Sequence, residues 1–334
     1  MKKIISFLKT DVKIINSYFL FTIVLIILVC IGYSSYALFS FTKTSTNIIE
    51  GTVGELSKSG TDTLIKLADN KDNSGLYTIT HVADSTLQIG NKSSITEYRY
   101  RGASPKNYVT FNNEVWRIIG IFKADDGTGN IENRIKIIRN DSIGIKYWNT
   151  TKVSSTSSYN DWTGATLNIY LNGTYLSGLT SEDQNIIGTA KYYLGGYNGS
   201  NVTADVIYQY ERKISGSGTY YYGTNPNSWI GKIALMYLSD YGYAASDECT
   251  KTLINYSDST CKSNNWLFDS NYQWTLFQNP YRSYTVYRVV PNGNYGNLNV
   301  YENLYNVRPT LYLVSSTKIT GGSGTSTDPY TLGI

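Results

Sequence analysis

The chain contains very little histidine, methionine, proline and charge. Its 334 residues include one histidine, 2 methionines and 6 prolines, and only 16% of them are charged. A single histidine excludes a histidine-rich metal site and argues against a Ser-His-Asp triad. His81 lies in a strand-like segment, where an isolated histidine more often packs or faces solvent than reacts. We therefore expect a packing or surface role for His81.

The little charge that exists argues against nucleic-acid binding. The formal net charge is +4, of which residues 1–16 supply +3. The charged residues of this segment are Lys2, Lys3, Lys9, Lys13 and Asp11. The remainder holds 25 basic and 24 acidic residues (29 minus 4, and 25 minus 1), so it is nearly neutral. Such a chain lacks the basic surface that phosphate contacts require, and no nucleic-acid partner is expected.

Tyrosine, glycine and asparagine are abundant, with 32 tyrosines and 29 glycines. The codon bias of an AT-rich genome produces a surplus of Tyr and Asn without any selection for function. That alternative applies to every inference below from these two residue types. Hydrophobic residues make up 41%, enough for the core of one large domain or two smaller ones.

One long apolar run lies near the N-terminus, from Tyr18 to Gly32, with a weakly polar continuation to Phe39. Basic residues precede it, which places the N-terminus in the cytoplasm and the following residues outside. Residues 18–39 are long enough to cross a bilayer as a single-pass anchor. Small residues around Ala37 also permit signal-peptidase cleavage after it. We expect an exported protein, secreted or at the cell surface, with its leader either cleaved or retained.

The segment Asn107–Phe122 predicts the centre of a sheet. Two strand-forming runs flank Asn112-Asn113, and an Asn pair between strands indicates a tight hairpin. The nearly continuous apolar run at 115–122 is typical of a strand covered on both faces. Arg134–Arg139 is the expected next strand. The loop at 125–130 between them has clustered oxygens for calcium but lacks EF-hand spacing, so we favour a hairpin connection.

Periodicity also predicts short helices. Apolar spacing indicates one over Thr61–Asn70, one over Asn160–Gly173, and one from Thr180 or Ser181 to Gly195-Gly196. Ser181 and Gln184 fit a capping box for the last of these. Trp229–Tyr243 predicts a return to a strand, followed by a turn at Ser239-Asp240.

Three stretches resemble a family of bacterial surface domains in the C-type-lectin-like class, which also contains the formylglycine-generating enzymes. They are Asn107–Phe122 (NYVTFNNEVWRIIGIF), Trp229–Ala244 (WIGKIALMYLSDYGYA) and Asn306–Leu313 (NVRPTLYL). The resemblance implies an α+β fold with short helices around a twisted antiparallel sheet, preceded by the N-terminal hydrophobic helix. It also implies that Val307–Leu313 is the terminal core strand.

The region after the leader resembles a second group of proteins. Residues 36–53, which begin Tyr36-Ala37-Leu38-Phe39-Ser40, are similar to the export-signal junction of Gram-positive camelysin-like and biofilm-fibre proteins. The expected organisation is a leader or anchor over 1–40, a linker with a short amphipathic helix over 41–97, and a C-type-lectin-like domain over 98–334.

The chain departs from these families at their functional motifs. Gln278-Asn279-Pro280 and Asn160-Asp161-Trp162 have the wrong order for a calcium-bridged sugar site, so we expect no cofactor. Cys249 and Cys261 are the only cysteines after the leader, and in an oxidising compartment they predict a disulfide. The alternative is a copper-binding thiol pair like that of formylglycine-generating oxidoreductases. It requires a dry pocket, whereas the intervening residues form a polar, loop-like segment.

A glycosidase is a further alternative, because three carboxylate residues lie beside aromatic residues in the sequence: Asp161, Glu211 and Asp240. Paired carboxylates hydrolyse glycosides only at a defined spatial separation. Helix capping by Asp161 and a turn at Asp240 explain two of the three without chemistry.

The most suggestive segment for binding is 279–306, which mixes tyrosine with Asn, Ser and Gly. Binding loops favour this mixture because Tyr offers a large rigid contact at little entropic cost. The candidate ligand-binding residues are Tyr281, Arg282, Tyr284, Tyr287, Asn294, Tyr295, Asn299 and Tyr301. Tyr284, Tyr295 and Tyr301 should then reach solvent, with Tyr220, Tyr221 and Tyr222 outside the binding face.

We therefore expect a protein that binds an extracellular protein or glycan and is not an enzyme. An oxidoreductase related to the formylglycine-generating enzymes and a structural envelope or matrix component remain the alternatives.

Overall fold

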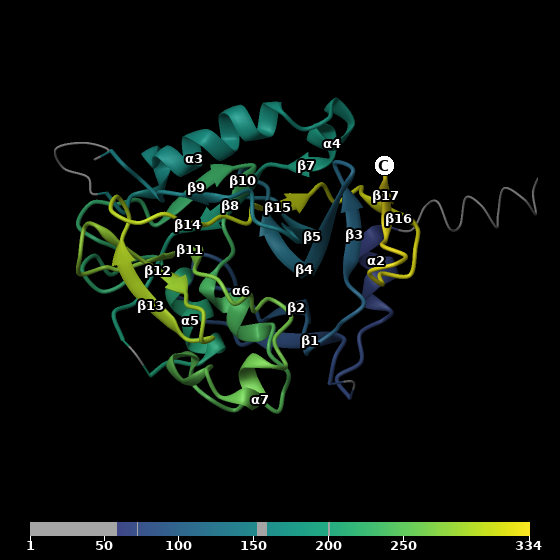
Figure 1. Ribbon diagram of the computed structural model, residues 1–334, viewed down its shortest axis with the longest axis horizontal. Helices are drawn as coiled ribbons and strands as arrows, with labels where there is room; N and C mark the ends of the chain where they lie inside the picture. Colours follow the sequence, from purple (N-terminus) through teal and green to yellow (C-terminus); the bar gives the residue numbers. More distant parts are fainter. Residues whose placement is uncertain (1–58, 72, 152–158, 200) are drawn as a thin grey trace, which may run out of the picture. The chain divides into compact units, whose positions relative to one another are not determined.

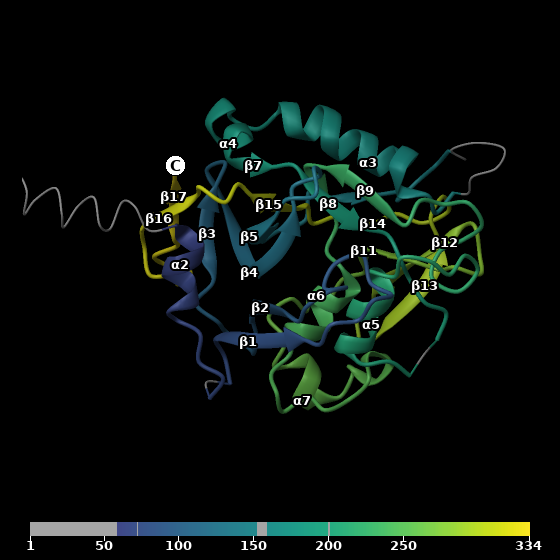
Figure 2. The same cartoon turned by 180° about the vertical axis from the view of Figure 1, so that it is seen from behind.

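The computed structural model describes residues 59–71, 73–151, 159–199 and 201–334. They belong to one compact unit, Ser59–Ile334, built mostly of antiparallel strands with a few short helices (Figures 1 and 2). The expected α+β class is confirmed at this level. The predicted leader, with its span at 18–39 and cleavage after Ala37, lies outside the described residues. Among the helices of the described ranges, none combines the length and apolar character needed to cross a membrane.

The main sheet has eight strands and contains most of the predicted core. Its path runs β1-β2-β4-β5-β15-β10, with β3 paired to β4 and β7 to β15. The strands are β1 (Leu76–His81), β2 (Ile95–Tyr100), β3 (Tyr108–Phe111), β4 (Glu114–Asp125), β5 (Ile131–Arg139), β7 (Ile187–Gly188), β10 (Ile233–Ala234) and β15 (Thr310–Leu313). β4 is buried without interruption from Trp116 to Phe122, as predicted for a strand covered on both faces.

The two predicted hairpins of this sheet are confirmed. Asn112 and Asn113 both adopt positive φ, 53° and 56°, and join β3 to β4 with Phe111 opposite Glu114. Asp125 Oδ1 accepts hydrogen bonds from the backbone of Gly127 and Gly129 in the turn between β4 and β5. This carboxylate therefore closes the hairpin.

A second sheet of five strands has the order β13-β12-β11-β14-β6. Its strands are β6 (Ile145–Lys146), β11 (Gln273–Gln278), β12 (Thr285–Val289), β13 (Tyr295–Asn299) and β14 (Tyr305–Asn306). All six residues of β11 are buried. Two further pairs are separate hairpins: β8 (Ala190–Tyr193) with β9 (Ser228–Gly231), and β16 (Lys318–Gly321) with β17 (Thr331–Gly333).

The helices are short, and Figure 1 shows α3 and α4 along the upper side of the view and α5, α6 and α7 in the lower half. They are α2 (Gly60–Ile65), η1 (Trp162–Gly164), α3 (Thr166–Tyr170), η2 (Leu171–Tyr175), α4 (Ser181–Ile186), α5 (Ala204–Glu211), α6 (Leu238–Tyr243), η3 (Leu253–Asn255) and α7 (Ser259–Lys262).

The expected start of the domain at residue 98 falls inside β2, so residues 59–97 are not a linker. β1 pairs with β2 along its full length, from Leu76 opposite Tyr100 to His81 opposite Ile95. Thr78 and Thr80 face partly or fully outward on this outermost strand of the sheet path. The strand-like segment that contains His81 is therefore an edge strand of the domain.

One predicted helix boundary is wrong, and for another the structure selects one of the two predicted residues. Gly173 lies inside η2 and does not end the helix, since it does not adopt the positive φ of a glycine that ends one. Thr180, rather than Ser181, caps α4 by accepting a hydrogen bond from the backbone of Asp183. The capping pair is therefore Thr180 with Asp183, one residue earlier in the chain than the predicted pair of Ser181 and Gln184.

Two segments also adopt another structure than predicted. α4 ends at Ile186, and the residues after it pair as β7 with β15 and as β8 with β9. Ser239-Asp240 lies in α6 instead of a turn, where the Asp240 carboxylate accepts from the Tyr237 backbone at 2.9 Å. Tertiary pairing overrides the local helix pattern in the first case.

Candidate functional site

The eight predicted ligand-binding residues do not form one exposed face. Tyr287 and Tyr295 are buried, with ring centroids 5.4 Å apart. Tyr281 is 58% exposed and Tyr284 37% exposed. Arg282 is also exposed, and Asn294, Asn299 and Tyr301 are half-buried. The expectation that Tyr295 reaches solvent is wrong, because the register of β13 turns its ring inward.

One group of these residues gathers around Tyr159. The Tyr301 ring lies 4.8 Å from the Tyr159 ring, and the backbone oxygen of Tyr284 accepts from Val300. Asn299 donates to Glu302 within the same turn. Asn294 lies elsewhere and accepts from the backbone of Ser257 at 2.6 Å. Both asparagines therefore hold local structure.

The other group forms a pocket of about 280 Å³. Its lining residues are Asn198, Gly199, Ile254, Tyr287, Tyr295, Gly296 and Asn297, which we call the tyrosine pocket. Tyr295 donates its hydroxyl hydrogen to the Gly199 carbonyl at 2.7 Å, and Tyr287 donates to Asn198 Oδ1 at 3.5 Å. None of the seven lining residues carries a charge. Burial raises the pKa of both tyrosines, so their hydroxyls stay protonated.

Strand register explains one wall of this pocket. Tyr287 pairs with Asn297, and Val289 pairs with Tyr295, across β12 and β13. Because side chains alternate between the two faces of a strand, these four residues share one face. The pattern was visible in the sequence, but the choice of face was not.

Two glycines determine the position of the pocket wall that contains Asn198 and Gly199. A side chain added at Gly196 would lie 1.8 Å from the Gln278 backbone oxygen, and one at Gly195 would lie 2.1 Å from that of Tyr210. Only glycine permits so close an approach to α5 and β11. The crossing brings Asn198 to the pocket. These glycines were predicted to end a helix, and their role is instead to let two chain segments cross.

Three half-buried tyrosines continue from the pocket. The Tyr197 and Tyr210 rings are 4.3 Å apart, and the Tyr210 and Tyr220 rings 5.2 Å. We call them the tyrosine row. The prediction left out Tyr197, Asn198 and Tyr210, and it placed Tyr220 outside the binding face. The Tyr-Asn-Gly composition of residues 197–199 matches that of the late segment and is the signal that could have found them.

A cluster of buried charges lies between the main sheet and the helices. Asp240 accepts from Arg99 Nη1 at 3.0 Å and from Lys136 Nζ at 2.5 Å. Arg99 also contacts Glu97 at 2.8 Å, and Arg212 contacts Glu211 at 2.7 Å. We call these six residues the charge cluster. Three carboxylates balance three cations, which is the condition for burying charges at tolerable cost.

The charge cluster accounts for two of the three carboxylates of the glycosidase alternative. Glu211 is fully buried and accepts from the Ser239 backbone and hydroxyl, and Asp240 is 1% exposed. Asp161 caps η1 through Thr163. None of the three presents a carboxylate to a substrate.

His81 packs beside the charge cluster. Its ring stacks on Tyr208 at 3.6 Å, and its Nδ1 lies 3.3 Å from Asp205. It is 6% exposed. In the part of the chain that the structure describes, no three His, Cys, Asp or Glu side chains group closely enough to hold a metal ion.

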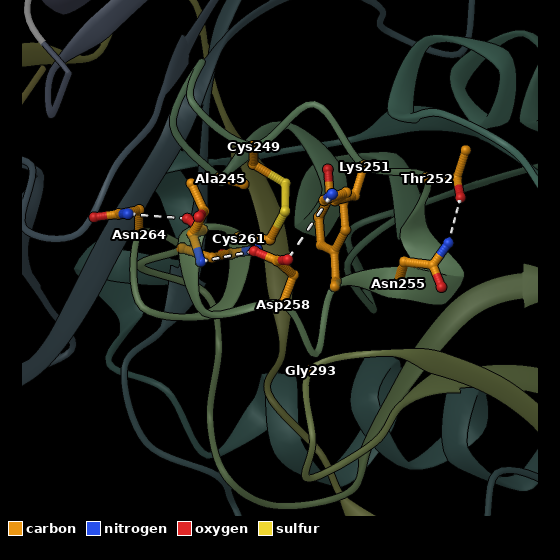
Figure 3. The surroundings of a disulfide bond; sticks show 12 residues. Ala245, Cys249, Lys251, Thr252, Asn255, Asp258, Cys261, Asn264 and Gly293 are labelled. Carbon is orange, nitrogen blue, oxygen red and sulfur yellow. Dashed lines mark hydrogen bonds and ion pairs between the residues drawn. A yellow bond between two sulfur atoms is a disulfide. The ribbon is translucent and has the colours of Figure 1, made fainter.

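The predicted disulfide between Cys249 and Cys261 is present (Figure 3). Both sulfurs are in the bond, which leaves no thiol pair for copper. The closed segment is less solvated than its composition indicates, because Leu253 and Tyr256 are buried and the Tyr256 hydroxyl donates to Gly242 at 3.0 Å. The ion pair between Lys251 and Asp258 crosses the same loop at 4.0 Å.

Removing the disulfide should lower stability. In the loop-entropy model a closed loop of this length contributes about 3 kcal/mol. We expect the double substitution Cys249→Ala with Cys261→Ala to lower the free energy of unfolding by about 2–4 kcal/mol. Chemical denaturation of the unreduced proteins measures this difference. An unchanged denaturation midpoint, or a free thiol at Cys249 or Cys261 in the wild type, would contradict the assignment.

Substitution of Asp240 should be more damaging. Asp240→Asn leaves Arg99 and Lys136 without their shared carboxylate, and breaking such a buried pair costs about 3–5 kcal/mol. The exposed Asp328→Asn serves as the matched control, with an expected change within about 0.5 kcal/mol. Equal denaturation midpoints for the two variants would show that the cluster does not hold the fold.

Glu97 should make stability depend on acid pH. Burial acts to raise its pKa, but Arg99 and His81 outweigh burial and hold the pKa at about 2, below the ordinary 4.5. A depressed folded-state pKa gives stability that is complete above pH 4.5 and lost as the pH falls toward 2. The loss should reach about 3 kcal/mol. Glu97→Gln should flatten this part of the pH profile, and an equally steep profile in the variant would disprove the assignment.

Comparison of the chain with protein-family models, curated proteins and solved structures gives no significant match.

Proposed function

We propose that this is an exported bacterial protein, at the cell surface or secreted, whose C-type-lectin-like domain binds an extracellular protein or glycan ligand without catalysis. The tyrosine pocket is the observation that carries the proposal. Two tyrosines and Asn297 of the late segment meet Asn198 and Gly199, about 90 residues earlier in the chain, around one concave space.

The chemistry of the pocket favours binding over catalysis. Its polar groups are amides, neutral hydroxyls and backbone carbonyls, which orient a ligand but do not transfer protons readily near neutral pH. The oxidoreductase alternative depends on two thiols, and those cysteines form the disulfide.

The export part of the proposal has independent support. The basic leader and the apolar run at 18–39 predict export, and the disulfide is typical of an oxidising compartment. The C-type-lectin-like assignment rests on the sequence resemblance at three stretches. It is supported by the position of Thr310–Leu313 as β15, buried between β5 and β10.

Protease treatment of intact cells tests the location. Protease should digest residues 59–334 without lysis, or the protein should be found in the medium. A cytoplasmic marker protein reports cell integrity. Protection of the chain until lysis would disprove export.

Substitutions in the tyrosine pocket test binding. Tyr287→Phe keeps the buried ring but removes the hydroxyl, and Asn198→Ala removes its partner. We expect each to reduce ligand affinity at least about 10-fold, since a site built to hydrogen-bond its ligand loses well over 1 kcal/mol with one group. The Asn198 side chain is exposed but accepts hydrogen bonds from the buried Tyr287 and Asn279, so the melting temperature of each variant is measured together with its affinity.

Tyr281→Ala is the control, because Tyr281 is 58% exposed and lies outside the pocket. Adhesion to the natural surface, measured with and without these substitutions, gives the readout. If adhesion depends on Tyr281 and not on Asn198 or Tyr287, the pocket is not the binding site.

A further inference from the structure

We infer that the tyrosine pocket and the tyrosine row form one continuous site for a linear, uncharged oligosaccharide, with one sugar unit in the pocket. This inference rests on the proposed function and names its ligand class.

The pocket and the row are adjacent in space. Tyr197, the first residue of the row, directly precedes Asn198 of the pocket wall. Its ring also packs against Gly199 of the pocket, since a side chain added at Gly199 would lie 1.9 Å from the Tyr197 ring. From Tyr197 the rings continue to Tyr210 and Tyr220 at centroid distances of 4.3 and 5.2 Å. A ligand leaving the pocket at Asn198 therefore meets these rings in sequence.

The absence of charge along the site selects an uncharged ligand. The pocket is lined by Tyr, Asn, Gly and Ile alone. Lys213 lies 5.9 Å from the Tyr220 ring and is engaged by Asp84 and Thr86. Arg288 does not line the pocket, and its guanidinium is engaged by the Gly296 carbonyl at 3.2 Å. Saccharides match the remaining groups, because their C–H faces pack on aromatic rings while their hydroxyls pair with amides, phenols and carbonyls.

The size of the pocket favours a chain of small units over a folded partner. A volume of 280 Å³ lies at the lower end of ligand pockets, enough for about one sugar ring. A stable protein partner would instead need about 800 Å² of its own surface around an apolar centre.

The row is held in place before any ligand arrives. Tyr210 is followed by Glu211 and Arg212 of the charge cluster, which fix the end of α5. Gly196 donates its backbone N–H to the Tyr220 carbonyl at 2.6 Å, which fixes the third ring relative to the crossing. Because the rings are already ordered, a ligand loses little binding free energy to immobilising them.

Calorimetric titration of the full chain, purified from membranes or medium, tests the inference. The probes are neutral β-1,4-linked glucose and N-acetylglucosamine oligomers of two to six units, and galacturonate oligomers as the charged comparison. Affinity for at least one neutral series should rise with length. Tyr210→Ser and Tyr220→Ser should each weaken binding of the longest oligomer about 2- to 10-fold and leave the disaccharide unaffected.

Tyr281→Ser is the matched control off the site and should bind all lengths as the wild type does. Affinity independent of length, equal losses for short and long oligomers, or tighter binding of the charged series would overturn the inference. If no saccharide binds but a protein ligand does, and Asn198→Ala abolishes it, the inference fails while the proposed function stands. If Asn198→Ala and Tyr287→Phe affect no ligand or adhesion, both fail.

Discussion

The contact of Asp240 with Arg99 and Lys136 is the constraint on which the rest of the fold depends. The three residues come from α6, β2 and β5, and all are buried. A charge so placed cannot tolerate another arrangement of these elements, because any shift would leave an ion without its partner in a dry interior. The cluster therefore fixes how the helices lie on the sheet.

The same constraint extends to the candidate binding site. Glu211 accepts from the backbone of Ser239, one residue before Asp240, so the end of α5 is tied to the start of α6. Tyr210 immediately precedes Glu211 and carries the middle ring of the tyrosine row. Gly195 passes close to α5 and Gly196 close to β11, and this crossing positions Tyr197 and Asn198. A variant that loosens the charge cluster should thus disturb binding through the row even though no charged group touches the ligand.

Local signals predicted the centre of the fold and long-range contacts decided the rest. Three features could be predicted from the sequence: the Asn112-Asn113 hairpin, the β4–β5 pair and the disulfide. The first two depend on residues close together in the chain, and the third on the only two cysteines after the leader. Asp240 was expected in a turn, since its partners Arg99 and Lys136 are 141 and 104 residues away. Tyr295 was expected to reach solvent, because composition does not reveal which face of a strand is covered; a shift of one residue in register would have exposed it.

Codon bias would account for the number of tyrosines in the chain, but not for where their hydroxyls lie. Several core tyrosines donate to backbone carbonyls inside the fold: Tyr241 to Gly293, Tyr256 to Gly242 and Tyr192 to Lys232. These three tyrosines are ordinary core residues with satisfied hydroxyls, and abundance alone argues for no function. Tyr287 and Tyr295 differ, because their hydroxyls reach the Asn198-Gly199 loop at the rim of a concave, uncharged space. The position of these two hydroxyls, and not the number of tyrosines, is what distinguishes a binding site from a biased composition.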